Sequence, residues 1–266
     1  MDVLGCSNPF GGAVYYEPVV DSTMHRVRML VSEGRKPGFV VAAGFQQSGR
    51  CRVSGRRWES APGESLMFTV ALPKDRVEGR GAPLPMIAAL ALATLIERKT
   101  TLHPLLKWPN DLLLDGKKVS GILCERYGSV AAVGIGLNVA QKSLPLEGRE
   151  GNTSAFGATS LLLESGMLFD PLSLLPELLT ALDAALSDSL WHRRCSDILY
   201  LRDREITLLD GDPNDGRKVR GRLVGIGERG ELLLDTGAGE PDAFFSAEIL
   251  FPRARDSEGA EGGPER

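Results

Sequence analysis

The chain has 266 residues, of which 42% are hydrophobic and 25% are charged, and its formal net charge is −4. This size allows one large domain and one small domain of ordinary globular composition. The slightly acidic balance excludes a general attraction to nucleic acid or to an anionic membrane surface, and no apolar run approaches the roughly eighteen residues needed to cross a bilayer. We therefore expect no nucleic-acid partner and no membrane association.

The N-terminal part of the chain is predicted to contain a helix among buried strands. Residues 19–20 form a short apolar run that meets Asp21 and Ser22, two residues typical of a helix N-cap. A helix is then expected at residues 24–33, ending at Gly34. Further apolar runs predict two buried strands and one buried central helix, at residues 39–43, 65–72 and 85–99.

The middle of the chain predicts a hairpin, and the last third predicts helices followed by short strands. Apolar residues 112–114 and 119–125 flank Asp115 and Gly116, a dipeptide that favours a hairpin turn. A further strand is expected at residues 130–139. Helical spacing follows at residues 159–166 and 171–190. Short strands, closely spaced as in a small barrel, are expected at residues 206–209, 218–226, 231–235 and 243–250. The predicted fold class is α+β with a β-barrel at the C-terminal end.

The four cysteines, Cys6, Cys51, Cys124 and Cys195, lie far apart and form no Cys-x-x-Cys pair. This pattern predicts neither a zinc site nor a disulfide framework, so reduced thiols in a cytoplasmic protein are expected. Residues 1–12 lack the basic start and the apolar core of a signal peptide, which supports the same location. Neither Cys51 nor Cys124 has a histidine nearby in the sequence, so we expect structural or incidental roles for both.

A Gly- and Arg-rich segment at residues 46–58 is the first candidate for chemistry. It reads Gln-Gln-Ser-Gly-Arg-Cys-Arg-Val-Ser-Gly-Arg-Arg-Trp, with four arginines in eight positions. Glycines let the backbone approach a ligand, and guanidinium groups match the oxygens of phosphates and carboxylates. The segment therefore indicates an anionic ligand, with a solvated basic loop as the alternative interpretation. Nucleic acid is less consistent with it, because one short cluster lacks a broad basic face.

The second candidate is the segment Lys-Trp-Pro-Asn-Asp at residues 107–111. Proline biases Trp108 towards an extended backbone, which places Asn110 and Asp111 at the start of the next strand. Their side-chain oxygens are of the kind that bind Mg²⁺ together with substrate phosphates. The alternative interpretation is an Asn-Asp turn before the hairpin, with Trp108 in the core.

Two later segments and the histidines carry weaker signals. Lys118 follows the hairpin turn, where a lysine is usually only solvated. Residues 134–138, Gly-Ile-Gly-Leu-Asn, lack the third glycine of a dinucleotide fingerprint, and no P-loop sequence occurs in the chain. The three histidines show no metal-ligand spacing. These patterns disfavour a nicotinamide enzyme and a P-loop ATPase.

Taken together, these segments resemble the biotin–protein ligases. The family pattern has Ser-Thr, then Gln-x-x-Gly-Arg-Gly-Arg-x-Gly-Arg-x-Trp, Lys-Trp-Pro-Asn-Asp, a Lys-x-x-Gly-Ile-Leu-x-Glu strand and a Gly-x-Gly-x-Asn strand. The same order occurs here, at residues 22–23, 46–58, 107–111, 118–125 and 134–138. The resemblance implies three parts: a mixed-sheet catalytic domain of the biotin/lipoate ligase type, an SH3-like β-barrel and a disordered tail, at residues 1–203, 204–253 and 254–266.

The resemblance further implies a reaction in two steps that uses ATP, biotin and Mg²⁺. The carboxylate of biotin attacks the α-phosphate of ATP to give biotinyl-5′-AMP and pyrophosphate. A lysine of biotin carboxyl carrier protein, or of another biotin-acceptor domain, then attacks this mixed anhydride. About twenty residues precede Ser22, so we expect the short form without an N-terminal DNA-binding domain. A homodimer is compatible with the family.

Position in the motifs implies roles for individual residues. Lys118, Arg52 and Asp111 are assigned to catalysis, and Lys118 would neutralise the charge that builds as two anions meet. Asn110 and Asp111 are assigned to Mg²⁺. Ligand binding is assigned to Ser22, Thr23, Met24, Gln46, Arg50, Cys51, Arg52, Trp58, Asn110, Lys118, Gly121 and Asn138.

Within that set, Ser22, Thr23 and Gln46 are expected to hydrogen-bond the ureido ring of biotin. Residues 50–52 are expected to cover biotin and the adenylate and to shield the adenylate from water. Trp58 is expected to pack against adenine.

Three features depart from the family pattern. Cys51 replaces the glycine between two loop arginines, Val53-Ser54 stands where one residue is usual, and Met24 follows Ser-Thr where a polar residue is usual. The alternatives are therefore a lipoate or octanoate ligase, and a non-catalytic relative that binds biotin or its adenylate. Lys-Trp-Pro-Asn-Asp favours biotin, and the Arg-Arg-x-x-Gly-Gly-Gly segment of lipoate enzymes is absent.

Overall fold

The structure is a computed structural model, and it describes residues 1–51, 57–58, 60–77, 83–144, 157–211 and 216–250. None of the helices in these ranges has the length and the apolar character that a membrane crossing requires. The predicted tail at residues 254–266 lies outside the described residues.

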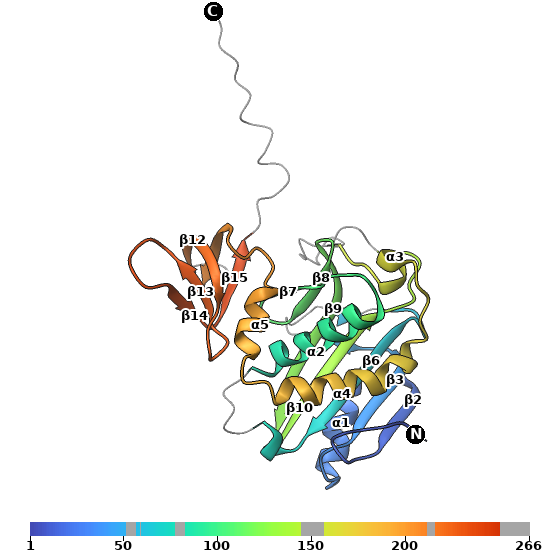
Figure 1. The fold of residues 1–266 in the computed structure, drawn as a ribbon. Coiled ribbons are helices and arrows are strands. Elements are labelled where there is room, and N and C mark those ends of the chain that lie inside the picture. Colours follow the sequence, from blue (N-terminus) through green and yellow to red (C-terminus); the bar gives the residue numbers. More distant parts are fainter. Residues whose placement is uncertain (52–56, 59, 78–82, 145–156, 212–215, 251–266) are drawn as a thin grey trace, which may run out of the picture. The chain divides into compact units, whose positions relative to one another are not determined.

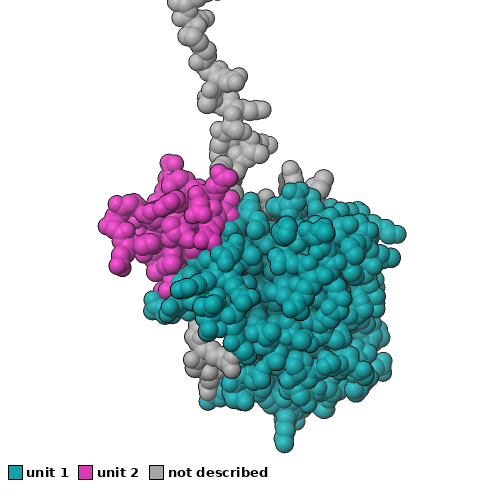
Figure 2. Space-filling model, viewed as in Figure 1, with its two compact units in different colours: residues 1–200, 226–230 teal, residues 201–225, 231–266 magenta. Residues whose placement is uncertain are grey.

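The chain divides into two compact units (Figure 2). The first contains residues 1–200 together with the short segment 226–230, and the second contains residues 201–225 and 231–266. Residues 226–230 interrupt the second unit in the sequence and belong to the first unit.

An eight-stranded mixed sheet forms the centre of the first unit (Figure 1). In spatial order its strands are β1 (Asp2–Leu4), β2 (Val14–Val20), β3 (Val40–Gln46), β6 (Ser65–Leu72), β10 (Val130–Asn138), β9 (Lys117–Tyr127), β8 (Asp111–Leu114) and β7 (Leu105–Lys107). Strands β2 and β3 run parallel, whereas every other neighbouring pair is antiparallel. The predicted α+β class with a mixed sheet is confirmed.

Helices cover this sheet because its central strands are apolar on both sides. All eight residues of β6 are buried, so covering a single face would leave half of them in water. Helix α1 (Thr23–Ser32) contacts β3, β6 and β10, whereas α2 (Leu84–Lys99) contacts β9 and β10 and packs against α4 (Leu175–Leu186) (Figure 1). The buried central helix predicted at residues 85–99 is confirmed.

Helix α1 begins where the sequence predicts, but its first turn is not capped by a side chain. Ser22 occupies the N-cap position with φ −159° and ψ 137°, and its side chain makes no capping hydrogen bond. Ser22 is also buried. The predicted stop is confirmed, because Gly34 adopts φ +83° directly after the helix.

Strands β8 and β9 form the predicted hairpin. Asp115 and Gly116 have φ values of 46° and 70°, and a two-residue type I′ turn requires left-handed backbone at both positions. Side chains alternate along β9, so the adjacent residues Lys117 and Lys118 point to opposite faces. Lys117 donates to Glu164 Oε1 at 2.9 Å, whereas Lys118 Nζ lies 2.7 Å from Asp111 Oδ1.

Glu164, on helix α3 (Leu161–Ser165), accepts hydrogen bonds from Thr159 and Lys117. Burial favours the neutral acid, but these bonds and the charge of Lys117 outweigh it and lower the pKa of Glu164. A carboxylate with a lowered pKa stabilises the fold above its ordinary pKa, and this contribution disappears as the pH falls through the lowered value. In urea denaturation we expect Glu164→Gln to reduce the free energy of unfolding more at about pH 7 than at about pH 3. Equal losses at the two pH values would contradict this prediction.

The helix predicted at residues 171–190 is confirmed up to Leu186, but its predicted end is four residues too late. A 3-10 turn, η2 (Pro171–Leu174), leads into α4, which ends at Leu186, and α5 (Trp191–Asp197) follows separately. The side chain of Asp188 accepts a hydrogen bond from the backbone N–H of Leu190 at 2.9 Å. This local bond competes with continued helical hydrogen bonding, which explains the break.

The second unit is a five-stranded sheet, as expected for a small SH3-like barrel. In spatial order its strands are β14 (Asp242–Phe244), β13 (Leu232–Asp235), β12 (Arg217–Ile226), β11 (Glu205–Asp210) and β15 (Ala247–Leu250). Strand β11 pairs antiparallel with both β12 and β15, and β13 pairs antiparallel with β14. The strand predicted at residues 243–250 is therefore two strands with different neighbours.

Trp108 lies in the core of the first unit and holds segment 226–230. It is 5% exposed, and its Nε1 donates to the carbonyl of Gly230 at 2.9 Å. Gly230 has φ +85°, and a Cβ there would lie 2.0 Å from Pro83 Cγ, so this position requires glycine.

We expect Trp108→Phe to lower the free energy of unfolding by about 1–3 kcal/mol, because the buried Gly230 carbonyl loses its donor. Urea denaturation of the full chain measures this change. An unchanged midpoint and slope would show that the hydrogen bond contributes nothing to stability.

Candidate active site

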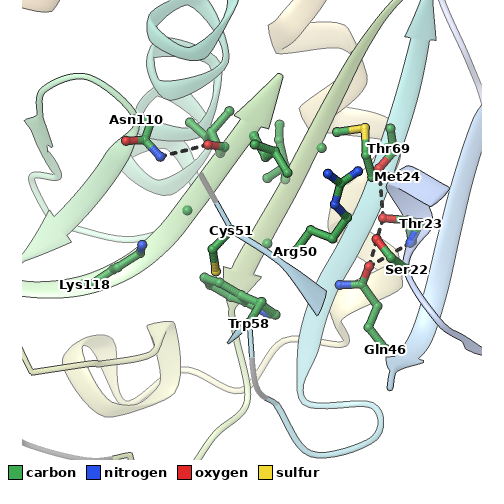
Figure 3. A pocket seen from close by; sticks show the side chains of 16 residues that line it. Ser22, Thr23, Met24, Gln46, Arg50, Cys51, Trp58, Thr69, Asn110 and Lys118 are labelled. Atoms are coloured by element: carbon green, nitrogen blue, oxygen red, sulfur yellow. Dashed lines mark hydrogen bonds between the residues drawn. The ribbon is translucent and has the colours of Figure 1, made fainter. Parts of the chain in front are cut away.

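An open pocket of about 500 Å³, counting the solvent at its mouth, lies beside the N-terminal end of α1 (Figure 3). Segments far apart in the sequence line it: the start of α1, the end of β3, the β4 (Gly49–Arg50) and β5 (Arg57–Trp58) pair, and strands β9 and β10. The lining includes many residues predicted to bind ligand, namely Ser22, Thr23, Met24, Gln46, Arg50, Cys51, Trp58, Asn110, Lys118 and Gly121.

One end of the pocket carries an uncharged, hydrogen-bonded group. Thr69 donates its hydroxyl to Thr23 Oγ1 at 2.8 Å, and Thr23 donates its N–H and its hydroxyl to Gln46 Oε1 at 2.8 and 3.2 Å (Figure 3). Because Gln46 Oε1 receives both Thr23 donors, the orientation of the amide is fixed and its NH₂ group points away from Thr23. Amide and hydroxyl groups of this kind suit a neutral polar ligand group such as a urea.

Trp58 packs against the backbone of two glycines on neighbouring strands. A Cβ would lie 2.7 Å from the Trp58 ring at Gly136 and 3.2 Å from it at Gly121. The glycines therefore leave the space that the indole occupies. Trp58 Nε1 is buried, and no acceptor for it lies among the described residues. This N–H is therefore a donor that a ligand acceptor can satisfy.

The side chain of Lys118 reaches the pocket from β9, between the carboxylate of Asp111 and the ring of Trp58. Its Nζ lies 2.7 Å from Asp111 Oδ1 and 6.0 Å from the centre of the Trp58 ring. The backbone of Lys118 donates to the carbonyl of Gly157 and accepts from the N–H of Thr159. Figure 3 shows the side chain of Lys118 extending towards the pocket from the side opposite Gln46. The pocket therefore has a cationic end and a neutral polar end.

Arg50 adds a second cation to the lining. Its two terminal nitrogens each lie 2.9 Å from an oxygen of Glu125, in a bidentate ion pair. Cys51, the next residue, also lines the pocket. The structure thus places this departure from the family pattern at the ligand site.

The described residues fit a Mg²⁺ ion poorly. The carboxylates of Asp111 and Glu125 are each balanced by a cation, Lys118 and Arg50 respectively. Asn110 lines the pocket, but a group of three or more His, Cys, Asp and Glu side chains suited to a metal is absent from the described part of the chain. An ammonium 2.7 Å from Asp111 opposes a cation at the same carboxylate. The assignment of Asn110 and Asp111 to Mg²⁺ stays a prediction.

Of the predicted site residues, one lies outside the described residues and one lies away from the pocket. Arg52 lies outside the described residues. Asn138 is 4% exposed and does not line the pocket; its amide donates to the carbonyl of Thr159 at 2.9 Å, and its Oδ1 accepts from Gln141 at 3.3 Å. In the structure Asn138 ties the end of β10 to the segment that precedes α3.

The cysteines behave largely as the sequence predicts. Within the described part of the chain, no disulfide joins any of the four. Burial raises the pKa of the Cys124 thiol far above its usual range, and burial together with Asp188 raises that of Cys195 to about 12. Neither thiol supplies a nucleophilic thiolate at neutral pH.

The sequence assigned no role to three residues that matter to the pocket: Thr69, Gly134 and Glu125. Thr69 is a polar residue in the middle of the apolar strand β6. A buried polar residue in such a strand is a sequence signal that favours a functional role. A Cβ at Gly134 would lie 2.9 Å from Met24 Cε, so this glycine makes room for the methionine. Glu125 belongs to the predicted motif but had no assigned role, because its partner Arg50 is 75 residues away in the sequence.

Comparison with known proteins agrees with this geometry. Residues 16–141 match the biotin/lipoate A/B protein ligase family. The chain is 30% identical over 251 residues to the bifunctional ligase/repressor BirA of Bacillus spizizenii, covering 90% of this chain and 74% of that protein. It is 40% identical over 107 residues to the biotin–[acetyl-CoA-carboxylase] ligase of Paracoccus denitrificans, covering 38% of this chain and 44% of that protein.

A solved structure shows the same likeness. The biotin protein ligase of Aquifex aeolicus, determined in complex with biotin and ATP, is 29% identical to this chain, and the two structures superpose with a TM-score of 0.74. The aligned region covers 91% of this chain and 99% of that one. The sequence and structural matches extend over both units rather than over one motif. This chain therefore belongs to the biotin/lipoate A/B protein ligase family, and its matched relatives are biotin–protein ligases.

Proposed function

We propose that this protein joins biotin to a specific lysine of an acceptor protein in two steps at the pocket described above. The observation that carries the proposal is the arrangement within one pocket of a neutral polar end at Thr23 and Gln46 and a cation, Lys118, on the opposite side. Biotin has the matching polarity, with a neutral ureido ring at one end and a carboxylate at the other.

The first step brings two anions together. A biotin carboxylate oxygen forms a bond to the α-phosphorus of ATP, the bond to the bridging oxygen breaks, and pyrophosphate leaves. Lys118 offsets the repulsion between carboxylate and phosphate, and this electrostatic stabilisation strengthens in a pocket that excludes water. Trp58 offers its ring to the adenine, and its buried Nε1 offers a donor to the ligand.

The second step transfers the biotinyl group. The neutral ε-amine of the acceptor lysine attacks the carbonyl carbon of biotinyl-AMP and loses one proton to solvent as the amide forms. AMP leaves with the electron pair of the cleaved C–O bond. Mg²⁺ would accompany ATP on its phosphates. The residues named here bind and orient the two substrates.

The direct test is formation of biotinyl-AMP and its transfer. The purified chain is incubated with biotin, ATP and Mg²⁺, pyrophosphate release is measured, and labelled biotin is followed onto a biotin carboxyl carrier domain. Pyrophosphate release that depends on biotin, followed by labelling of the acceptor, is expected. Tight biotin binding without pyrophosphate release would instead indicate a non-catalytic biotin-binding relative.

The principal alternative within the family is a lipoate or octanoate ligase. The polar end of the pocket opposes it, because Thr23, Gln46 and Thr69 would face the apolar tail of these acids. Competition of biotin against lipoate and octanoate in the pyrophosphate assay distinguishes a biotin ligase from a lipoate or octanoate ligase. Only biotin is expected to be used.

The partner of this reaction is proposed to be a biotin-acceptor domain in the cytoplasm, where the four free thiols would stay reduced. No nucleic-acid partner is proposed, because the net charge is −4. A homodimer is compatible with this proposal, and sedimentation with and without biotin measures it. A gel-shift assay on the promoter of biotin synthesis genes should show no complex.

A further inference from the structure

Strand β9 ends in two polar residues that share a face with the pocket. Side chains alternate along a strand, so Glu125 and Tyr127 lie on the same face as Gly121 and Leu123, which line the pocket. Glu125 is only partly exposed, at 23% of its side chain. A carboxylate on β9 thus lies beside Arg50, a residue that lines the pocket.

The Glu125 carboxylate is engaged on both sides. Arg50 Nη1 donates to Oε2 and Arg50 Nη2 contacts Oε1, each at 2.9 Å, while the hydroxyl of Tyr127 donates to Oε2. Burial, followed by the bond to Glu125, raises the pKa of Tyr127, so this hydroxyl keeps its proton at neutral pH. Tyr127 therefore holds the carboxylate in the orientation that receives both nitrogens of Arg50.

We propose that Glu125, oriented by Tyr127, is a positioning residue that holds the guanidinium of Arg50 at the pocket to receive the anionic group of the ligand. The proposal rests on the proposed function and deepens it by giving roles to Glu125 and Tyr127. The anion is either the carboxylate of biotin or a phosphate of ATP. Both are oxyanions that a guanidinium binds through paired hydrogen bonds.

The geometry favours positioning over competition with the ligand. A guanidinium has five N–H donors, and a bidentate carboxylate engages two of them, so donors remain for a second oxyanion. The Arg50 side chain is 47% exposed and would otherwise sample many rotamers. Fixing it on β9 before the ligand arrives reduces the entropy lost on binding.

The test measures affinity for charged and uncharged members of two ligand pairs by calorimetry on the full chain. The first pair is biotin and biotinamide, which differ in the carboxylate, and the second is ATP and adenosine, which differ in the phosphates. We expect Glu125→Gln to weaken the charged member of at least one pair about tenfold, with little effect on its uncharged counterpart. The pair that responds identifies the anion. Tyr127→Phe should produce a smaller loss in the same pair.

Two further variants separate positioning from general destabilisation. In an Arg50→Gln background, Glu125→Gln should cause no additional loss, because its effect passes through Arg50. Glu125→Asp should recover part of the affinity. The matched control is Glu17→Gln: Glu17 pairs with Arg26 at 2.7 Å and is 21% exposed, yet it does not line the pocket. This control should leave all four affinities unchanged.

Three results would overturn the inference. Equal losses for charged and uncharged ligands would show a structural role, additive losses in the double variant would show independence from Arg50, and tighter binding by Glu125→Gln would show competition. A wild-type chain that binds neither biotin nor ATP overturns the proposed function together with this inference. Normal wild-type binding with any of the three results overturns the inference alone.

Discussion

Replacing Lys118 with alanine is expected to lower the rate of biotinyl-AMP formation by about 10²–10³-fold. Lys118 Nζ is fixed by Asp111 at the cationic end of the pocket, where the carboxylate and the α-phosphate must approach. Removing the ammonium leaves their mutual repulsion less compensated in the transition state than in the separated substrates, so the rate falls. Biotin-dependent pyrophosphate release under saturating ATP and biotin measures the effect.

The adjacent lysine is a matched control for this prediction. Lys117 lies on the opposite face of β9 and pairs with Glu164 at 2.9 Å, so Lys117→Ala changes the same charge without touching the pocket. Its rate should stay close to that of the wild type after correction for the folded fraction. A Lys118→Ala rate within about threefold of the wild type would remove Lys118 from the mechanism.

Gly136→Ala is expected to weaken ATP binding about tenfold or more, because overpacking typically costs about 1–3 kcal/mol. The new Cβ would lie 2.7, 2.9 and 3.0 Å from three atoms of the Trp58 ring, so the indole must move. Trp58 is the proposed adenine contact, and its displacement removes both the stacking surface and the buried Nε1 donor. Calorimetry with ATP measures the loss.

Two other glycines show whether this effect is specific. At Gly134 the nearest atom to a new Cβ is the Met24 methyl at 2.9 Å, the end of a flexible side chain, so Gly134→Ala should weaken ATP binding less. Gly5 has no atom within 4 Å of a new Cβ, and Gly5→Ala should leave ATP binding unchanged. Unaltered ATP affinity in Gly136→Ala would show that Trp58 does not contact the nucleotide.

Much of the fold was predictable from local patterns. The central helix α2 and the hairpin at Asp115-Gly116 carry strong signals, an apolar surface nearly all round and a turn dipeptide that tolerates left-handed backbone. The short edge strands β1 and β7 were not predicted, because three residues form no recognisable alternation and their pairing depends on a neighbour. The break after Leu186 was missed because the Asp188 side-chain bond is a local competitor that apolar periodicity does not reveal.

The sequence by itself determined the family, the order of the motifs and most of the residues that line the pocket, because each motif is a short contiguous signature. Only the tertiary structure decided which side chains meet. It paired Lys118 with Asp111, Trp58 with Gly136, and Arg50 with Glu125.

It also separated motif residues from pocket residues. Asn138 belongs to a signature yet is buried in a structural hydrogen-bond network, and Trp108 holds Gly230 in the core rather than contacting the pocket. The physical reason is the same in each case. The alternation along a strand predicts which face of the sheet a side chain occupies. Its partner on that face comes from a segment distant in the sequence, so the local sequence pattern does not reveal which two side chains meet.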